Sequence, residues 1–100
     1  MPTVYVTAPR EAADDLARLL VDERLAACVN VVDCESTYRW EGEVHEEPEA
    51  ILLVKTTTEA CEELMERVSA AHPYDVPSIE RFEESRVAGP FAAWREDVVG

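Results

Sequence analysis

Hydrophobic residues follow two long arms in the middle of the chain, and this pattern predicts a long β-hairpin over residues 24–57. The first arm holds Cys28–Val32 and Ser36–Trp40, and the second arm ends in the apolar run Ile51–Val54. Glu41–Gly42 between the arms predicts a tight turn, because glycine readily adopts the positive φ that a two-residue hairpin loop needs. We expect the rest of the chain to pack against this hairpin.

The predicted turn also fixes which residues of the two arms face each other. With two loop residues the numbers of facing positions add up to 83, and the predicted pairs are Trp40 with Glu43, Tyr38 with His45, and Val32 with Ile51. The inner half of the hairpin is apolar on both faces. This pattern is typical of strands that are covered on each side.

The outer half of the hairpin differs, because aromatic residues there alternate with polar ones. Tyr38 and Trp40 lie opposite a run of glutamates, and Pro48 interrupts the second arm. Proline cannot donate to a strand ladder, so this half is expected to leave the sheet as a ribbon. Since exposed aromatic residues usually mark an interface, we expect the ribbon to dock on another copy of the chain.

A strand and a helix are predicted before the hairpin. Thr3–Ala8 is rich in β-forming residues and is interpreted as the first strand. The helix is expected to begin near Pro9–Glu11, where proline and an acidic residue suit a first turn, and to end near residues 23–25. Its apolar positions have helical spacing and predict one buried stripe, made of Ala12, Leu16, Leu19 and Leu20.

A second helix is predicted after the hairpin. Thr57 or Thr58 is expected to cap this helix, and Pro73 is expected to end it at about Ala71. A loop stiffened by two prolines, His72–Pro77, comes next. The buried stripe of the helix is predicted to hold Cys61, Leu64, Met65 and Val68.

The last part of the chain predicts a fourth strand and a short helix. Ser78–Arg86 is interpreted as the strand, but Ile79 and Phe82 have opposite parity, so a bulge or burial on both faces is expected. Gly89–Pro90 is expected to open the helix, in which one face carries Phe91, Trp94 and Val98.

The resulting order is strand, helix, strand, strand, helix, strand. This order is typical of an α+β ferredoxin-like sandwich, in which a four-stranded antiparallel sheet carries both main helices on one face. We therefore predict a single domain over residues 1–100, with a long central hairpin and a short C-terminal helix.

The charge of the chain limits its partners. The sequence holds 22 acidic and 9 basic residues, which gives a formal net charge of −13. This charge argues against binding to nucleic acids or anionic membranes, since both require positive charge to displace counterions. The acids are scattered rather than collected in a tail, which leads to the hypothesis that the protein is adapted to a salt-rich cytosol. No stretch approaches the ~20 apolar residues of a membrane span, and the first residues lack the basic region of a signal peptide, so a cytoplasmic location is expected.

The cysteines and the only lysine predict structural roles. Three cysteines leave one unpaired in any disulfide scheme and match no zinc spacing, which favours reduced thiols. Cys28 and Cys34 are expected to be inert, because acids rather than cations surround them. Lys55 faces Cys28 in the predicted register and is expected to form a structural salt bridge or to line a cleft between subunits.

Two places carry candidate metal ligands. His72 is the preferred one, because it lies beside a rigid loop and near Tyr74 and Asp75. A histidine before proline also commonly makes hydrogen bonds at a helix end, and this alternative stays open. His45–Glu49 is a denser set of donors, for which a solvated ribbon is the favoured interpretation. A cation bound there would be a hard ion held weakly by oxygen ligands.

Six segments, taken together, resemble the CutA divalent-cation tolerance family. They occur in the order of that family and cover nearly the whole chain. The segments are Thr7–Pro9, Glu23–Asn30, Tyr38–Gly42, Glu49–Thr57, His72–Pro77 and Phe91–Trp94. The resemblance implies a ferredoxin-like subunit in a stable homotrimer whose long hairpins pair between neighbours, similar to PII signalling proteins. It also implies a link to tolerance of copper and other divalent cations, without an established catalytic reaction.

The resemblance carries over only one residue of the copper site described in this family. Members that bind copper resemble one another at a cysteine before the Thr-Ala-Pro segment and at a histidine pair before Pro-Tyr. Here these positions hold Val6, Ala71 and His72, and Ser78 stands where the family usually has a glutamate. A soft cysteine and histidine site for copper is therefore not carried over intact.

Three functions are weighed. The first is a non-enzymatic, trimeric CutA-like protein that binds divalent cations such as copper or zinc weakly or acts through an unidentified protein partner. The second is a small-molecule sensor resembling PII proteins, with its ligand between subunits near Lys55, Tyr74 and Arg24. The third is an enzyme that uses carboxylates and His72 in the same cleft.

Overall fold

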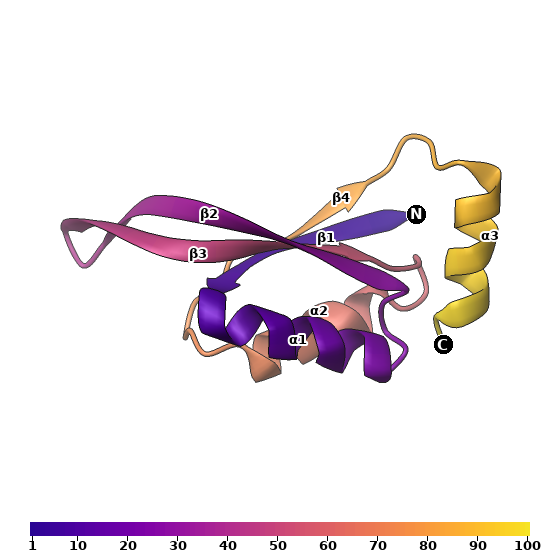
Figure 1. Cartoon of the computed structure of the whole chain (residues 1–100), viewed down its shortest axis with the longest axis horizontal. Coiled ribbons are helices and arrows are strands. Elements are labelled where there is room, and N and C mark those ends of the chain that lie inside the picture. The colour runs from indigo at the N-terminus through magenta and orange to yellow at the C-terminus, as the bar shows by residue number, and fades with distance from the viewer.

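The computed structural model describes residues 1–100 and arranges them in the predicted βαββαβ order followed by a third helix (Figure 1). The elements are β1 Pro2–Pro9, α1 Arg10–Asp22, β2 Cys28–Trp40, β3 Glu43–Lys55, α2 Cys61–Ala71, β4 Ile79–Glu83 and α3 Gly89–Val98. The four strands form one antiparallel sheet in the order β2-β3-β1-β4. Helices α1 and α2 lie together on one face of this sheet, so the predicted ferredoxin-like fold is confirmed.

The hairpin of β2 and β3 is the longest feature of the molecule. Each strand has 13 residues, and the three predicted facing pairs are all present. The turn residues have positive φ angles, +52° at Glu41 and +81° at Gly42, as a tight two-residue loop requires. Because β1 pairs only with Glu49–Lys55 of β3, the outer half of the hairpin extends beyond the sheet (Figure 1).

The hydrophobic core lies between the sheet and the two main helices. Fourteen buried residues form it, with Val4, Val6, Leu52 and Val54 from the sheet among the best buried. The stripe of α1 differs from the prediction, because Ala13 is buried and Ala12 is only partly buried. The stripe of α2 is predicted correctly at its three buried positions, which are Cys61, Leu64 and Val68.

The opposite face of the sheet is not covered in a single chain. Alternate positions of the strands place apolar side chains on it, and two of them are widely exposed, Val32 at 47% and Phe82 at 55%. The expectation that the inner hairpin is covered on both sides is therefore wrong for one chain. Exposed apolar surface of this kind commonly marks an interaction site.

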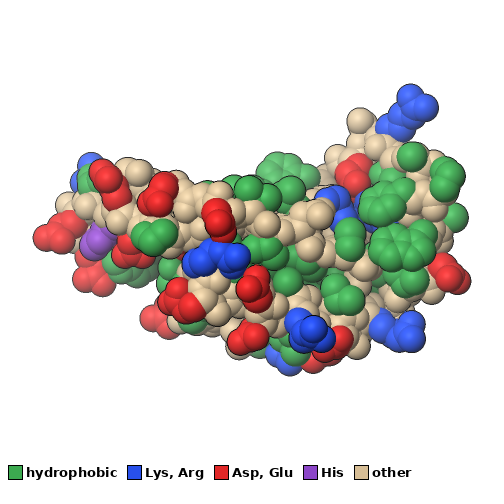
Figure 2. All heavy atoms as spheres, in the orientation of Figure 1, with side chains coloured by type: hydrophobic (Ala, Val, Ile, Leu, Met, Phe, Trp, Pro, Cys, Tyr) green, Lys and Arg blue, Asp and Glu red, His purple; other side chains and the backbone are tan.

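The last two elements are simpler than expected. β4 pairs regularly with β1 and needs no bulge, because Ile79 faces the helices while Phe82 lies on the open face. In α3, Pro90 occupies the first turn, and Phe91 and Trp94 stack with ring centroids 5.7 Å apart. In the view of Figure 2, hydrophobic side chains gather over α3, whereas acidic side chains are scattered over the hairpin and stand among basic ones over the helices. None of the helices combines the length and apolar character that a membrane crossing requires.

Candidate functional site

A cavity of about 740 Å³ lies at the base of the outer hairpin. Its walls come from the outer hairpin, the end of β1 and the loop that joins α2 to β4. Besides four serine and threonine residues, the lining holds two groups of three side chains with distinct chemistry. They are the carboxylates Glu47, Glu49 and Asp75 and the aromatic residues Tyr38, Trp40 and Tyr74.

Glu49 anchors the loop to the sheet. It lies on β3 between β1 and β2 and is only 5% exposed. The hydroxyl of Tyr74 donates a hydrogen bond of 2.8 Å to Glu49 Oε2. Burial raises the pKa of Tyr74 strongly, and the neighbouring carboxylates of Glu49 and Glu47 raise it further. Tyr74 therefore stays a neutral donor at any physiological pH.

Tyr38 forms a second wall of the cavity. Its ring stacks on His45, the facing residue of the hairpin, with centroids 5.5 Å apart. Burial raises the pKa of Tyr38, and the nearby Glu47 carboxylate raises it as well. The cavity therefore combines aromatic surfaces with a negative field.

His72 lies at the C-terminal end of α2, and both of its ring nitrogens have protein partners. Nε2 is 2.8 Å from the carbonyl oxygen of Thr7, and Nδ1 accepts a hydrogen bond of 3.1 Å from the backbone N–H of Tyr74. Since Nδ1 accepts, Nε2 carries the proton and donates to Thr7. A metal ion at His72 must displace one of these hydrogen bonds. The role of His72 as a metal ligand stays a prediction.

The other candidate metal ligands do not converge within one chain. No group of three or more histidine, cysteine, aspartate or glutamate side chains is placed to hold a metal ion. The three cysteines are free thiols, and Cys61 is buried in the core, where burial raises its pKa. Protein metal sites commonly use three or more protein ligands, and no such set is assembled within this chain.

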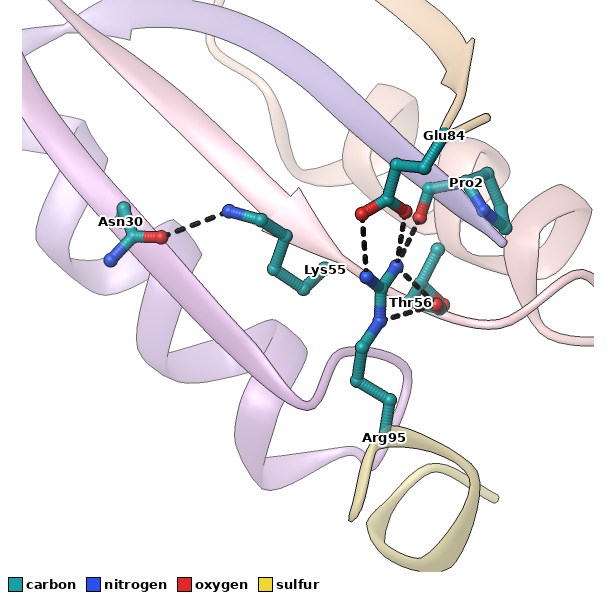
Figure 3. Close-up of polar contacts among 6 residues, drawn as sticks. All are labelled: Pro2, Asn30, Lys55, Thr56, Glu84 and Arg95. Atoms are coloured by element: carbon teal, nitrogen blue, oxygen red, sulfur yellow. Dashed lines mark hydrogen bonds and ion pairs between the residues drawn. The ribbon is translucent and has the colours of Figure 1, made fainter. Parts of the chain in front are cut away.

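The residues proposed for a small-molecule site are only partly brought together. Tyr74 lines the cavity, but Lys55 and Arg24 do not. Lys55 Nζ donates a hydrogen bond of 3.0 Å to Asn30 Oδ1 and makes no ion pair, so the predicted salt bridge of Lys55 is wrong (Figure 3). Asn30, two residues along the strand from Cys28, supplies a neutral acceptor that sequence reasoning overlooked.

Sequence reasoning also missed the buried Arg95 of α3. Its guanidinium is fully buried and donates two hydrogen bonds to the Glu84 carboxylate, at 2.7 and 2.8 Å. It also donates to the carbonyl oxygens of Pro2 and Thr56, as Figure 3 shows. The available signal was an arginine four residues after Phe91, on the side of the helix that should face the protein. Arg95 therefore attaches α3 to one end of the sheet, where β1 begins and β3 and β4 end.

The fold and the cavity together define a class of protein. The sheet order β2-β3-β1-β4, the long hairpin and the cavity at its base are those of a ferredoxin-like domain with an extended hairpin. The family described as CutA1 divalent ion tolerance protein matches residues 2–98. The chain belongs to this family, and the predicted resemblance is confirmed.

Individual relatives agree with this assignment. The divalent-cation tolerance protein CutA of Thermus thermophilus is 58% identical over 78 residues, which cover 76% of each protein. The chloroplastic protein CutA of Arabidopsis thaliana is 51% identical over 78 residues, covering 76% of this chain and 43% of the relative. The crystal structure of CutA1 from Pyrococcus horikoshii matches with a TM-score of 0.96 and 36% identity, covering 100% of this chain and 99% of that one.

Proposed function

We propose that this protein is a non-enzymatic homotrimer that acts in divalent-cation tolerance and binds divalent cations weakly. Membership of the CutA1 family supports the link to cation tolerance. The main support for the proposed trimer is the uncovered apolar face of the sheet. This face continues into the exposed aromatic residues Tyr38 and Trp40 of the outer hairpin.

The edges of the hairpin support the same assembly. β2 is an edge strand along its full 13 residues, and the outer half of β3 has no second neighbour in the chain. Such unpaired edges readily pair with another chain unless a protein covers them. In a closed trimer each hairpin lies on a neighbouring subunit, so its edges and the apolar sheet face become buried together.

We propose weak cation binding because both ring nitrogens of His72 already have protein partners. His72 is the proposed nitrogen ligand, and its binding to a metal competes with its hydrogen bond to Tyr74 or to Thr7. Further ligands would come from a neighbouring subunit. Copper or zinc are the candidate ions, but Val6 is a buried core residue and Ala71 offers no donor, so no soft ligand joins His72.

Calorimetric titration tests the metal proposal, and the chain offers a matched control because it has only two histidines. Copper, zinc and nickel are titrated into the wild type, His72→Ala and His45→Ala. The proposal expects weak binding heat in the wild type and in His45→Ala, and loss of that heat in His72→Ala. Loss only in His45→Ala would move the site to the outer hairpin, and absence of heat in all three would remove metal binding from the proposal.

A second candidate function is a small-molecule sensor resembling PII proteins. The cavity at the hairpin base favours it, because its volume of about 740 Å³ lies within the usual range for small-molecule sites. A screen of nucleotides and metabolites by thermal melting tests this candidate, since a ligand that binds only the folded protein raises the melting temperature. A screen in which no compound raises the midpoint would remove it.

The cellular setting is proposed from the sequence. A cytoplasmic location and action through an unidentified protein partner fit a small acidic domain without catalytic residues. Adaptation to a salt-rich cytosol fits its excess of acids, 22 against 9 basic residues.

A further inference from the structure

The cavity at the hairpin base has the chemistry of a site for a positively charged organic molecule. No lysine or arginine lines it, whereas three carboxylates and three aromatic residues do. On the hairpin the two classes lie on separate strands, with Tyr38 and Trp40 on β2 and Glu47 and Glu49 on β3. Anionic ligands, including nucleotides, are therefore disfavoured by the lining itself.

Glu49 supplies an acceptor that no protein group uses. Glu49 is only 5% exposed. Of its two carboxylate oxygens, only Oε2 receives a hydrogen bond from the protein, donated by Tyr74. Every side-chain oxygen or nitrogen that is inaccessible to solvent has a hydrogen-bond partner in the chain. Oε1 of Glu49 has no partner in the protein and therefore keeps contact with solvent, and Glu49 lines the cavity. This oxygen is free to accept a hydrogen bond from a ligand that replaces water in the cavity.

The arrangement suits an organic cation better than a metal ion. A metal needs several converging donors, and no such group of three exists in the chain. An ammonium group needs one carboxylate, and its alkyl chain gains from aromatic faces through cation–π and apolar contacts. Burial is the main cause of the raised pKa values of Tyr38 and Tyr74, and the nearby glutamate carboxylates raise both pKa values further.

We propose that the cavity binds small organic cations of the alkylammonium class, with the ammonium group donating to Glu49 Oε1 and the alkyl chain lying against Tyr38, Trp40 and Tyr74. This inference rests on the second candidate function, because it names the class of ligand for the same cavity. Glu47 and Asp75 on the cavity wall favour a ligand with a second positive charge.

Calorimetric titration with butane-1,4-diamine, with butane-1,4-diol as the neutral ligand of equal length, tests the proposal. The titration is done on the protein in its native assembly at physiological salt. The diamine is expected to bind at one site per chain and the diol is expected not to bind. Glu49→Gln keeps the size of the side chain and its acceptor for Tyr74, and is expected to weaken diamine binding about tenfold or more.

Glu66→Gln is the matched control variant. It makes the same change of charge on an exposed position of α2, outside the cavity, and is expected to change the affinity less than about twofold. Equal weakening in both variants would show that the diamine binds only through the net charge of the protein, and would overturn the proposal. Melting temperatures of both variants establish that each is folded.

Fluorescence locates the ligand independently of affinity. The chain has two tryptophans, and Trp40 lines the cavity while Trp94 lies on α3. In a Trp94→Phe background, the diamine is expected to change the emission of Trp40, and an unchanged emission on saturation would contradict the assigned site. If the diamine does not bind but another compound raises the melting temperature, the alkylammonium proposal is wrong and the sensor function stands. If no compound binds, the alkylammonium proposal and the sensor function are both wrong.

Discussion

The most consequential single side chain is the buried Arg95. It makes all its hydrogen bonds to groups that are far away in sequence, namely Pro2, Thr56 and Glu84. α3 buries no other side chain, so its attachment depends on this residue. The guanidinium is fully satisfied, which explains how the fold tolerates a charge at 0% exposure.

Replacing Arg95 by methionine is expected to destabilise the protein by about 3 kcal/mol, because the Glu84 carboxylate and two carbonyl oxygens lose their donor. Denaturant unfolding at a fixed protomer concentration measures this. Arg86→Met is the control, since Arg86 is exposed and has no ion pair, and it is expected to cost less than about 0.5 kcal/mol. Equal costs for the two variants would contradict the role assigned to Arg95.

The same pair predicts a dependence of stability on pH. Hydrogen bonds from Arg95 hold the pKa of Glu84 below its ordinary value. A lowered folded-state pKa means that this stabilisation is complete above the unfolded glutamate pKa of about 4.3 and is lost as the pH falls through the lower folded value. The wild type is expected to exceed Glu84→Gln in unfolding free energy at pH 7, and the difference is expected to shrink below about pH 4. A difference that is constant from pH 7 to pH 3 would contradict this account.

Two residues of the candidate site illustrate what sequence alone can find. The sequence predicts His72 as a candidate, because a histidine between a helix and a proline-stiffened loop is a local signal. For Glu49 the sequence predicts an acidic, solvated ribbon, and only the return of the α2–β4 loop over β3 buries it against Tyr74, 25 residues away. Contacts of this kind depend on tertiary packing and leave no periodicity in the sequence.

The central hairpin shows the opposite case, because its register could be derived from the turn. Glu41 and Gly42 form a two-residue loop with positive φ, and all facing pairs follow from it. Strand and helix order were also predictable, since each element carries its own apolar period. The coverage of the two sheet faces could not be predicted. A strand pattern that is apolar on both faces does not tell whether the second face is covered by the same chain or by another molecule.

The turn itself provides a paired test. Gly42→Ala is expected to destabilise the hairpin by about 1 kcal/mol, because an added Cβ is strained at a φ of +81° even though nothing crowds it. Gly89→Ala is the control, since Gly89 has no positive φ and opens α3 with free space around it. It is expected to be neutral or to stabilise slightly. Thermal unfolding of the two variants and the wild type measures both effects, and equal shifts would contradict the strain argument.

At the scale of the whole molecule, charge is expected to make stability depend on salt. The net charge of −13 is spread over a chain whose longest extent is 45 Å. Salt screens the repulsion between these carboxylates, so the melting temperature is expected to rise from dilute buffer to about 1 M sodium chloride. Equal midpoints under the two conditions would count against the proposed adaptation to a salt-rich cytosol.

The open apolar face and the projecting hairpin are features of the whole molecule as well, and they determine its proposed assembly. A single chain leaves Val32 and Trp40 about half exposed, which is costly for residues on a broad apolar surface. Trp40, Glu47 and Glu49 line the cavity at the hairpin base. Association through the open face and the hairpin would therefore also add walls to this cavity.

The mass of the protein in solution tests this account most directly. Light scattering coupled to size-exclusion chromatography, at micromolar protein and physiological salt, is expected to give about 34 kDa, three times the 11.2 kDa of one chain. The emission of Trp40 in the Trp94→Phe variant is expected to be that of a buried indole. A single species of about 11 kDa with a solvent-exposed Trp40 would contradict the proposed trimer.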